Sequence, residues 1–168
     1  MSLFTPDLML NNLTELGFSD LKKRGIKGIV LDVDNTLTLH GSQEVLPIVL
    51  DWLASMKSQG MKLMLVSNNT RERVTPFAQR LGLDFVAMGC KPLPYGLKRA
   101  QRQMGLSADQ IGLVGDQIYT DILGGNAAGF WTVLVEPFEL ESGFFFRLKR
   151  SLEQFHIRKY QRKNGGRL

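Results

Sequence analysis

The chain has 168 residues, 43% of them hydrophobic, which suits one globular domain with a core of its own. Its single cysteine, Cys90, excludes an internal disulfide framework and a cysteine-rich zinc site, and it fits a reducing compartment. No apolar run approaches the roughly 20 residues of a membrane-spanning helix, and the first residues lack the pattern of a secretory signal. We therefore expect a cytoplasmic protein.

The net charge of +5 is distributed unevenly along the chain. Residues 147–168 contain eight basic residues and one acid, Glu153, a net charge of +7. Residues 1–146 contain 13 basic and 15 acidic residues, a net charge of −2. The basicity thus belongs to a C-terminal tail. We divide the chain into a domain at 1–141 and a basic, amphipathic tail at 142–168.

The first 27 residues predict helical and irregular structure that packs on the domain. Thr5 and Pro6 form a helix-start signal, with Thr5 as the N-cap, and Gly17 would end that helix. A short second turn is predicted over 19–24.

From residue 27 onward, apolar runs of strand length alternate with segments of helical periodicity. The predicted strands are 27–33, 62–67, 85–87, 111–115 and 131–135, and the predicted helices are 46–59, 71–81, 95–104 and 121–128. Strands that alternate with helices predict an α/β fold with a parallel, doubly wound sheet.

The first of these strands runs directly into two carboxylates, Asp32 and Asp34. Ligands bind at the carboxyl ends of strands in such sheets, and residues two apart in an extended chain point the same way. Two neighbouring carboxylates repel unless a cation lies near them, which calls for a hard divalent ion, with Mg²⁺ the best fit. An Asp-x-Asp pair on a solvated turn would look the same, so the prediction depends on partners at other strand ends.

Three later strands provide such partners. Ser67 ends the second strand, beside Asn68, at a helix start that suits a phosphate. Lys91 follows the third strand as a cation able to reach a phosphate, and Asp116 and Asp121 follow the fourth. Each alone could be a cap, a turn or a surface residue. Their order at successive strand ends favours a phosphate-handling site.

These residues stand in four short motifs. The motifs are Asp32-Val33-Asp34-Asn35-Thr36, Ser67-Asn68-Asn69, Lys91-Pro92 and Gly115-Asp116-Gln117-Ile118-Tyr119-Thr120-Asp121. In this order they resemble the motifs of the haloacid dehalogenase (HAD) superfamily of phosphatases, over about residues 25–135. The resemblance implies a Rossmann-like three-layer sandwich whose parallel five-stranded sheet has the order 5-4-1-2-3. More narrowly, the motifs and the basic tail resemble the YqeG-type branch of subfamily IIIA, which is similar to mitochondrial phosphatidylglycerophosphate phosphatase.

The resemblance also implies roles for the four aspartates. Asp32 would be the nucleophile that forms an aspartyl-phosphate, and Asp34 would act as general acid and then as general base. Mg²⁺ would be held by Asp32, the backbone carbonyl of Asp34 and Asp116, with Asp121 in support. A carboxylate at position 34 favours a phosphatase over a dehalogenase, and no motif position lacks a competent residue.

The remaining motif residues would handle the phosphoryl group. Ser67, beside Asn68, would hydrogen-bond its oxygens, and Lys91 would neutralise developing charge. Only 32 residues separate Asp34 from Ser67 and 23 separate Ser67 from Lys91, so no cap domain fits. An open site suits a large substrate, such as a lipid headgroup, a protein or a nucleic-acid end, or else an oligomer in which a neighbouring subunit forms the lid.

The tail offers three interpretations. On a helix, Phe145, Leu148, Leu152 and Phe155 would form one apolar stripe backed by cations. Such a helix over 144–163 suits peripheral contact with anionic lipid on the inner face of a membrane. A helix docked on the domain is an equal alternative. Nucleic acid is the weakest, since no known nucleic-acid module accompanies the tail.

We predict a Mg²⁺-dependent phosphomonoesterase, with phosphatidylglycerophosphate as the substrate that the resemblance implies. The alternatives are a capless HAD phosphatase of a soluble or macromolecular phosphate, and a non-catalytic HAD-fold protein that binds RNA or the ribosome. His40 and His156 lack ligand spacing and are interpreted as structural or surface residues.

Overall fold

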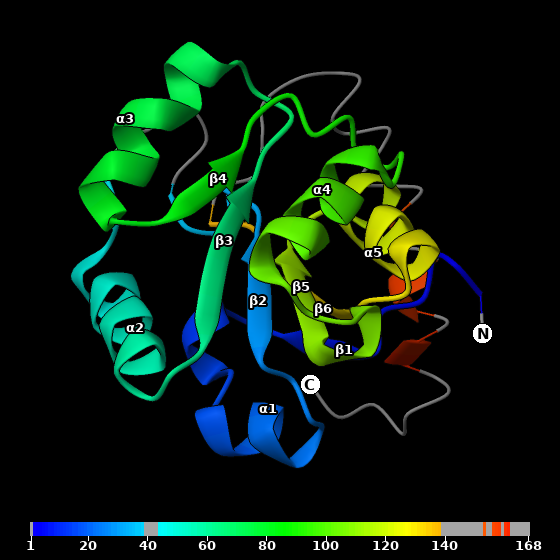
Figure 1. Ribbon diagram of the computed structural model, residues 1–168. Coiled ribbons are helices and arrows are strands. Elements are labelled where there is room, and N and C mark those ends of the chain that lie inside the picture. The colour runs from blue at the N-terminus through cyan, green and yellow to red at the C-terminus, as the bar shows by residue number, and fades with distance from the viewer. Residues whose placement is uncertain (1, 39–43, 139–152, 154–155, 159, 162–168) are drawn as a thin grey trace.

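A parallel sheet, with six strands among the described residues, runs through the centre of the molecule (Figure 1). The computed structural model describes residues 2–38, 44–138, 153, 156–158 and 160–161. In sheet order the strands are β1 (Leu8–Leu10), β6 (Trp131–Val135), β5 (Ile111–Gly115), β2 (Gly28–Leu31), β3 (Lys62–Val66) and β4 (Asp84–Val86). All neighbouring strands pair in parallel, and β2 lies in the middle of the sheet.

The helices divide between the two faces of the sheet. They are α1 (Phe18–Lys23), α2 (Pro47–Ser58), α3 (Arg71–Leu81), α4 (Tyr95–Met104) and α5 (Leu123–Ala128). Along β2, Ile29 and Leu31 pack in the core beneath α1, α2 and α3. Val30 points the opposite way, into the core beneath α4 and α5, which lie in front of the sheet in Figure 1. Burial on both faces explains why this strand is a continuous apolar run.

The predicted α/β class and the predicted strand order are confirmed. The five strands expected from the sequence form the order β6-β5-β2-β3-β4, and α3 and α4 have the predicted bounds. The predicted helix over 121–128 differs, because it begins as a π-helical turn, η3 (Ile118–Ile122), and continues as α5. Among the described residues, the interval from Asp34 to Ser67 contains α2 and that from Ser67 to Lys91 contains α3, without an inserted domain.

The helix predicted over 5–17 is wrong, and the sheet has a sixth strand in its place. Residues Leu8–Leu10 form β1, which pairs with β6, and a single 3-10 turn, η1 (Leu13–Glu15), follows. Asp7 fastens this segment to β6, because its backbone N–H donates to Thr132 O at 3.0 Å and its carboxylate accepts from Thr132 N at 2.8 Å. The new strand pairs with backbone groups that would otherwise form an exposed edge.

The described part of the tail contacts the domain. Glu153 is buried, and its Oε1 accepts a hydrogen bond from the Ile118 backbone N–H at 2.9 Å. His156 stacks on Phe4 with ring centroids 5.1 Å apart, and Ile157 packs on the small core that contains Ile118. At these positions the tail is docked, while the predicted apolar stripe lies outside the described residues, as does His40. In the parts of the chain that are described, no helix is both long and apolar enough to cross a membrane.

Candidate active site

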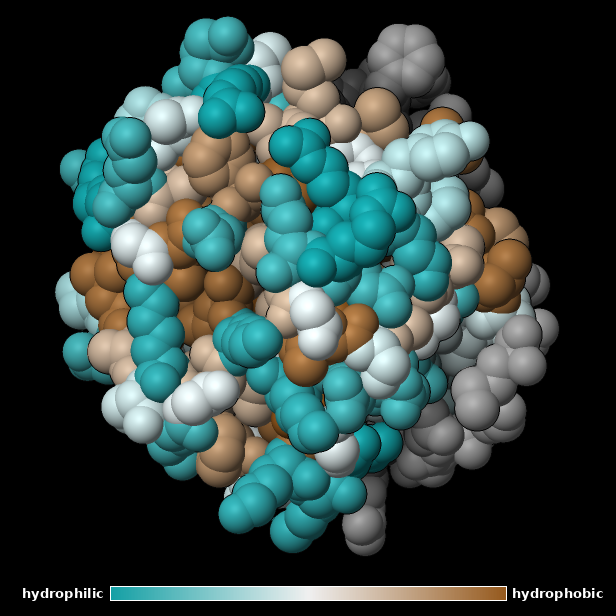
Figure 2. Space-filling view, viewed as in Figure 1, coloured by the Kyte–Doolittle hydropathy of each residue, from teal (hydrophilic) through white to brown (hydrophobic). Residues whose placement is uncertain are grey.

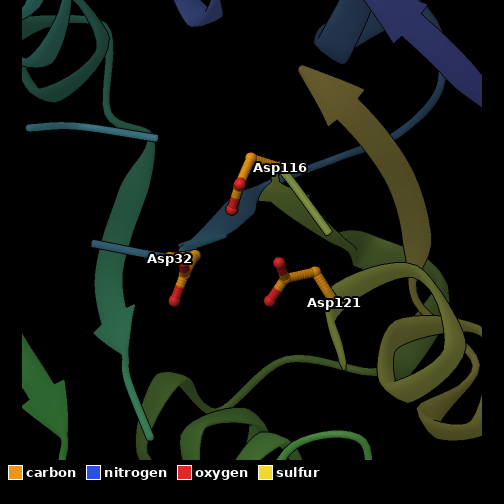
Figure 3. Close-up of side chains that lie close together, drawn as sticks. All are labelled: Asp32, Asp116 and Asp121. Carbon is orange, nitrogen blue, oxygen red and sulfur yellow. The ribbon is translucent and has the colours of Figure 1, made fainter. Parts of the chain in front are cut away.

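Three acidic side chains meet at the carboxyl edge of the sheet, beside its central strands. Asp32 directly follows β2 and Asp116 directly follows β5, and because these strands pair in parallel their carboxyl ends lie side by side. The turn η3 brings Asp121 to the same place (Figure 3). One carboxylate oxygen from each residue lies within 4.8 Å of the other two. We call Asp32, Asp116 and Asp121 the carboxylate cluster.

The cluster is deep and opens on one side. Asp116 and Asp121 are each 1% exposed, whereas the side chain of Asp32 is 13% exposed, so a ligand would approach past Asp32. Gly115 makes room for Asp121, because a Cβ at position 115 would lie 2.4 Å from the Asp121 Cγ. The Gln117 N–H also donates to Asp121 Oδ2 at 3.1 Å, which fixes the orientation of that carboxylate.

Lys91 reaches into the carboxylate cluster. Its Nζ lies 2.6 Å from Asp32 Oδ1 and 2.6 Å from Asp121 Oδ1. Its side chain is only 2% exposed, which excludes the alternative of a solvated surface lysine. One ammonium group thus bridges a carboxylate that follows β2 and a carboxylate carried by η3.

Burial and neighbouring charges shift the pKa values of Asp32 and Lys91. Burial raises the pKa of Asp32 from 3.8 to about 6, although the Lys91 ammonium opposes the shift. Burial alone would lower the pKa of Lys91, but the carboxylates of Asp121 and Asp32 raise it above its ordinary range. Lys91 is therefore a permanent cation at neutral pH.

The loop that carries Lys91 is joined to the segment after β3. The Lys91 N–H donates to Asn68 Oδ1 at 2.7 Å, and Asn68 Nδ2 donates to the Lys91 carbonyl at 2.9 Å. Ser67 is buried beside this pair, and its Oγ accepts from the Asn69 N–H at 3.1 Å. Asn68 is thus placed where it positions Lys91, and the predicted substrate contacts of Ser67 and Asn68 stay predictions.

Asp34 lies outside the carboxylate cluster, and its side chain is held by two other residues. Arg73 Nη2, from the first turn of α3, is 2.6 Å from Asp34 Oδ1, and Asn69 Nδ2 donates to Asp34 Oδ2. The side chain of Asp34 is 15% exposed, so it lines the accessible part of the site. Its predicted metal contact used the backbone carbonyl, and that contact stays a prediction.

Comparisons with known proteins decide the family. The profile described as haloacid dehalogenase-like hydrolase matches residues 39–129. The Bacillus subtilis protein named "Probable phosphatase YqeG" is 37% identical over 160 residues, which are 95% of this chain and 93% of that protein. The chain belongs to the HAD superfamily. The resemblance predicted from the four motifs, to HAD phosphatases of the YqeG type, is confirmed, and the chain is a phosphoric monoester hydrolase of this superfamily.

Three further matches show how far the similarity extends. The profile of mitochondrial PGP phosphatase matches residues 1–76. "Phosphatidylglycerophosphate phosphatase 1" of Arabidopsis thaliana is 27% identical over 94% of this chain, but over only 48% of that longer protein. The cobalt-bound deoxy-D-mannose-octulosonate 8-phosphate phosphatase of Haemophilus influenzae shares the fold, with a TM-score of 0.55, 13% identity and coverage of 83% and 91% of the two chains.

The donor set of this HAD hydrolase fits a divalent metal. Oxygen donors are the ligands that hard divalent cations prefer, and three carboxylates lie within reach of one ion. Three ionised carboxylates and the Lys91 ammonium carry a formal charge of −2, which a divalent cation would balance. HAD hydrolases use a divalent metal, and the residues present here suit one.

Two residues that shape the site were not found by sequence reasoning. Arg73 contacts Asp34, and its only signal was a cation in the first turn of the helix that follows Ser67. Glu153 supports η3 from the tail, where it is the single acid in a basic segment. Neither belongs to one of the four motifs. Each acts through a residue that is distant in the sequence, Arg73 through Asp34 and Glu153 through Ile118, so the sequence alone does not reveal the contact.

Proposed function

We propose that the protein is a Mg²⁺-dependent phosphatase that converts phosphatidylglycerophosphate to phosphatidylglycerol through an aspartyl-phosphate on Asp32. The observation that carries the chemistry is the bridge from Lys91 to Asp32 and Asp121 inside a buried carboxylate cluster. Such a cluster concentrates charge where an anionic nucleophile must meet an anionic ester.

In the first step, a carboxylate oxygen of Asp32 attacks phosphorus, and the bond from phosphorus to the alcohol oxygen breaks. Asp34 donates a proton to the departing alkoxide. Lys91 holds the Asp32 carboxylate in place through this step, and its charge offsets the negative charge that gathers on the phosphoryl oxygens.

In the second step, water attacks phosphorus and Asp34 accepts a proton from it. The bond between phosphorus and the Asp32 oxygen breaks, which releases inorganic phosphate and restores both carboxyl groups to their starting states. Arg73 and Asn69 hold the Asp34 side chain where it can serve both steps. Ser67 and Asn68 would orient the phosphoryl group next to Lys91.

The metal would be held by Asp32, Asp116 and the backbone carbonyl of Asp34, with Asp121 close by. When bound, Mg²⁺ would lower the electrostatic repulsion between the Asp32 carboxylate and the phosphate ester. The carboxylate cluster suits a divalent cation, because Lys91 neutralises only part of the negative charge of its three carboxylates.

The lipid substrate is supported by the relatives and by the absence of an inserted domain among the described residues. The matching profile is described as mitochondrial PGP phosphatase, and the Arabidopsis relative is named phosphatidylglycerophosphate phosphatase. A Chlamydomonas reinhardtii protein of the same name is 30% identical over 95% of this chain and 63% of that longer protein. An open site can accept a headgroup that stays attached to a membrane, so we place the enzyme in the cytoplasm at the inner face of the membrane.

The test is phosphate release from phosphatidylglycerophosphate in mixed micelles, beside a panel of soluble phosphate esters. We expect turnover with Mg²⁺, none with a chelator, and none from Asp32→Asn. Asp109→Asn is the matched control, because Asp109 is exposed and precedes β5 at the opposite end of the sheet. Turnover of soluble esters alone would leave a phosphatase and reject the lipid. Folded protein without turnover of any ester would reject the proposed chemistry.

A further inference from the structure

The loop from β4 to α4 combines a buried lysine with exposed apolar side chains. Lys91 points into the carboxylate cluster, whereas Met88 is 67% exposed, Leu93 55% and Tyr95 74%. Seven large hydrophobic residues are exposed in the described part of the chain, and three of them fall within residues 88–95. Single exposed apolar residues are ordinary on a protein surface, but a group of them beside a site indicates an interaction. We call Met88, Leu93 and Tyr95 the apolar rim.

The fold holds the apolar rim outward. The Met88 N–H donates to the Asn69 carbonyl at 2.9 Å, and the Gly89 N–H donates to the Ser67 carbonyl at 2.9 Å. The two ends of the loop touch, because a Cβ on Gly96 would lie 2.4 Å from the Gly89 carbonyl oxygen. These contacts tie the loop to the site on one side and to α4 on the other, so the rim side chains have little freedom to fold inward.

Two backbone conformations in this loop support the same conclusion. Met88 has a φ of 50° and Cys90 a φ of 55°, in the left-handed region that residues with side chains seldom adopt. Such conformations persist where the surrounding structure enforces them, and they gather at functional sites. At these positions they direct Lys91 inward and Met88 outward within a span of four residues.

Exposed cations lie on the two helices that flank the apolar rim in the sequence. Residues 68–104, which include α3, the loop and α4, contain seven basic and two acidic residues, and one of the seven, Lys91, is buried in the site. Arg71, in the first turn of α3, and Arg99, in the second turn of α4, are exposed, and Figure 2 shows a hydrophilic surface over α4. Exposed apolar side chains with cations on the neighbouring helices complement a surface that has negative charges at its face and hydrocarbon beneath them, which describes an anionic phospholipid bilayer.

We propose that the apolar rim docks the open active site directly onto an anionic phospholipid bilayer. The proposal rests on the proposed function, because a lipid phosphomonoester keeps its acyl chains in the bilayer and presents its phosphate at the headgroup level. Insertion of Met88, Leu93 and Tyr95 would bring the opening beside Asp32 to that level. The bilayer would then cover the site, in the place where other enzymes need a cap.

The native cysteine provides a direct test. Cys90 is exposed, lies between Met88 and Leu93, and is the single cysteine of the chain. We would label it with an environment-sensitive fluorophore and add phosphatidylglycerol–phosphatidylcholine vesicles that contain a lipid with a quencher in its acyl chains. We expect a blue shift and quenching. The control is the same label on Asp109→Cys in a Cys90→Ser background, at the far end of the sheet, where neither change is expected.

A second measurement separates the apolar rim from the basic tail. In the full chain, the triple variant Met88→Ser/Leu93→Ser/Tyr95→Ser should bind these vesicles about tenfold or more weakly, because three apolar side chains no longer enter the bilayer. The matched control is Leu3→Ser/Ile48→Ser/Leu50→Ser, which changes three other exposed apolar residues and should bind as the wild type does. Circular dichroism would confirm that both variants are folded.

The outcomes distinguish the docking from the proposed function. A Cys90 label that stays in water on bound protein, or a rim variant that binds no worse than its control, overturns the docking even if the wild type hydrolyses phosphatidylglycerophosphate. If the Cys90 label inserts into the bilayer but the wild type does not hydrolyse phosphatidylglycerophosphate, the docking proposal stands and the lipid substrate is rejected. Wild type that binds no vesicle overturns the docking, and the rim would then fit a protein partner.

Discussion

Two ion pairs of equal length lie at the same edge of the sheet at different depths. Lys91 Nζ is 2.6 Å from Asp32 Oδ1, and the lysine side chain is 2% exposed. Arg73 Nη2 is also 2.6 Å from Asp34 Oδ1, but the arginine side chain is 38% exposed. Breaking a buried pair leaves an uncompensated charge at a cost of about 3–5 kcal/mol, whereas an exposed pair contributes about 0–1 kcal/mol.

The difference matches the two roles that we propose. The inner pair fixes the position of the Asp32 nucleophile beside Lys91, whose charge does not change while bonds to phosphorus form and break, so a rigid arrangement serves it. The outer pair involves Asp34, which must give up a proton and take one back. Partial exposure lets the surroundings of Asp34 adjust to both states, since water shares in the solvation of each.

Removing the inner cation should have the largest effect. Lys91→Met leaves the carboxylates of Asp32 and Asp121 buried together, which should lower the free energy of unfolding by about 3–5 kcal/mol in metal-free protein. It should also lower kcat by about a thousandfold, through loss of transition-state charge stabilisation. Urea unfolding and steady-state kinetics measure the two effects. Lys23→Met is the control at an exposed lysine, and a Lys91→Met enzyme with a tenth of the normal kcat would contradict the proposed role.

The titration of Asp32 should make the inner pair sensitive to pH. Its pKa is about 6 in the folded metal-free protein and near 3.8 in the unfolded chain, so the folded state binds the proton more tightly. The free energy of unfolding should therefore fall as the pH rises from about 4 to 6, and this group alone contributes about 2–3 kcal/mol. Other carboxyl groups also titrate in this range, so the measurement is the difference between wild type and Asp32→Asn. Parallel stability curves from pH 4 to 7 in chelator would contradict the assignment.

The sequence predicted the fold through local patterns and predicted the candidate site through motif order. Strands β2 and β5 were visible because burial on both faces makes each a continuous apolar run. The short strand β1 was missed, because three residues carry too little periodicity and their conformation depends on pairing with β6.

The candidate site was predicted unevenly for the same reason. Asp32, Asp116, Asp121 and Lys91 each follow a strand, so the topology alone brings them to one edge of the sheet. Arg73 and Glu153 contribute through contacts that only the folded chain creates. Local sequence could show that each is charged, but not what each faces.

Glu153 should affect the inner pair indirectly, by supporting the turn that carries Asp121. Its Oε1 accepts from the N–H of Ile118, the first residue of the turn η3 that carries Asp121. Glu153→Ala leaves that buried N–H without this acceptor, which should cost about 1–3 kcal/mol of stability, and it should weaken Mg²⁺ binding in a calorimetric titration. Glu153→Gln keeps an acceptor oxygen and should lose less. Glu136→Ala, at an exposed acid after β6, is the control. Equal Mg²⁺ affinity in Glu153→Ala and the control would show that the tail does not support the site.

Arg73→Gln breaks the outer pair, and its effect on stability should be the smallest. Because Arg73 is substantially exposed, the free energy of unfolding should change by less than about 1 kcal/mol. Turnover should nevertheless fall by about ten- to a hundredfold, because Asp34 loses one of the groups that hold it in position. Arg80→Gln, in the last turn of α3 and exposed, is the matched control for charge. If both variants turn over substrate at the same rate, the ion pair does not position Asp34. Arg73→Gln should therefore lose turnover and keep its stability, whereas Lys91→Met should lose both. That contrast would show that an ion pair in this site contributes to stability only when it is buried, although both pairs contribute to turnover.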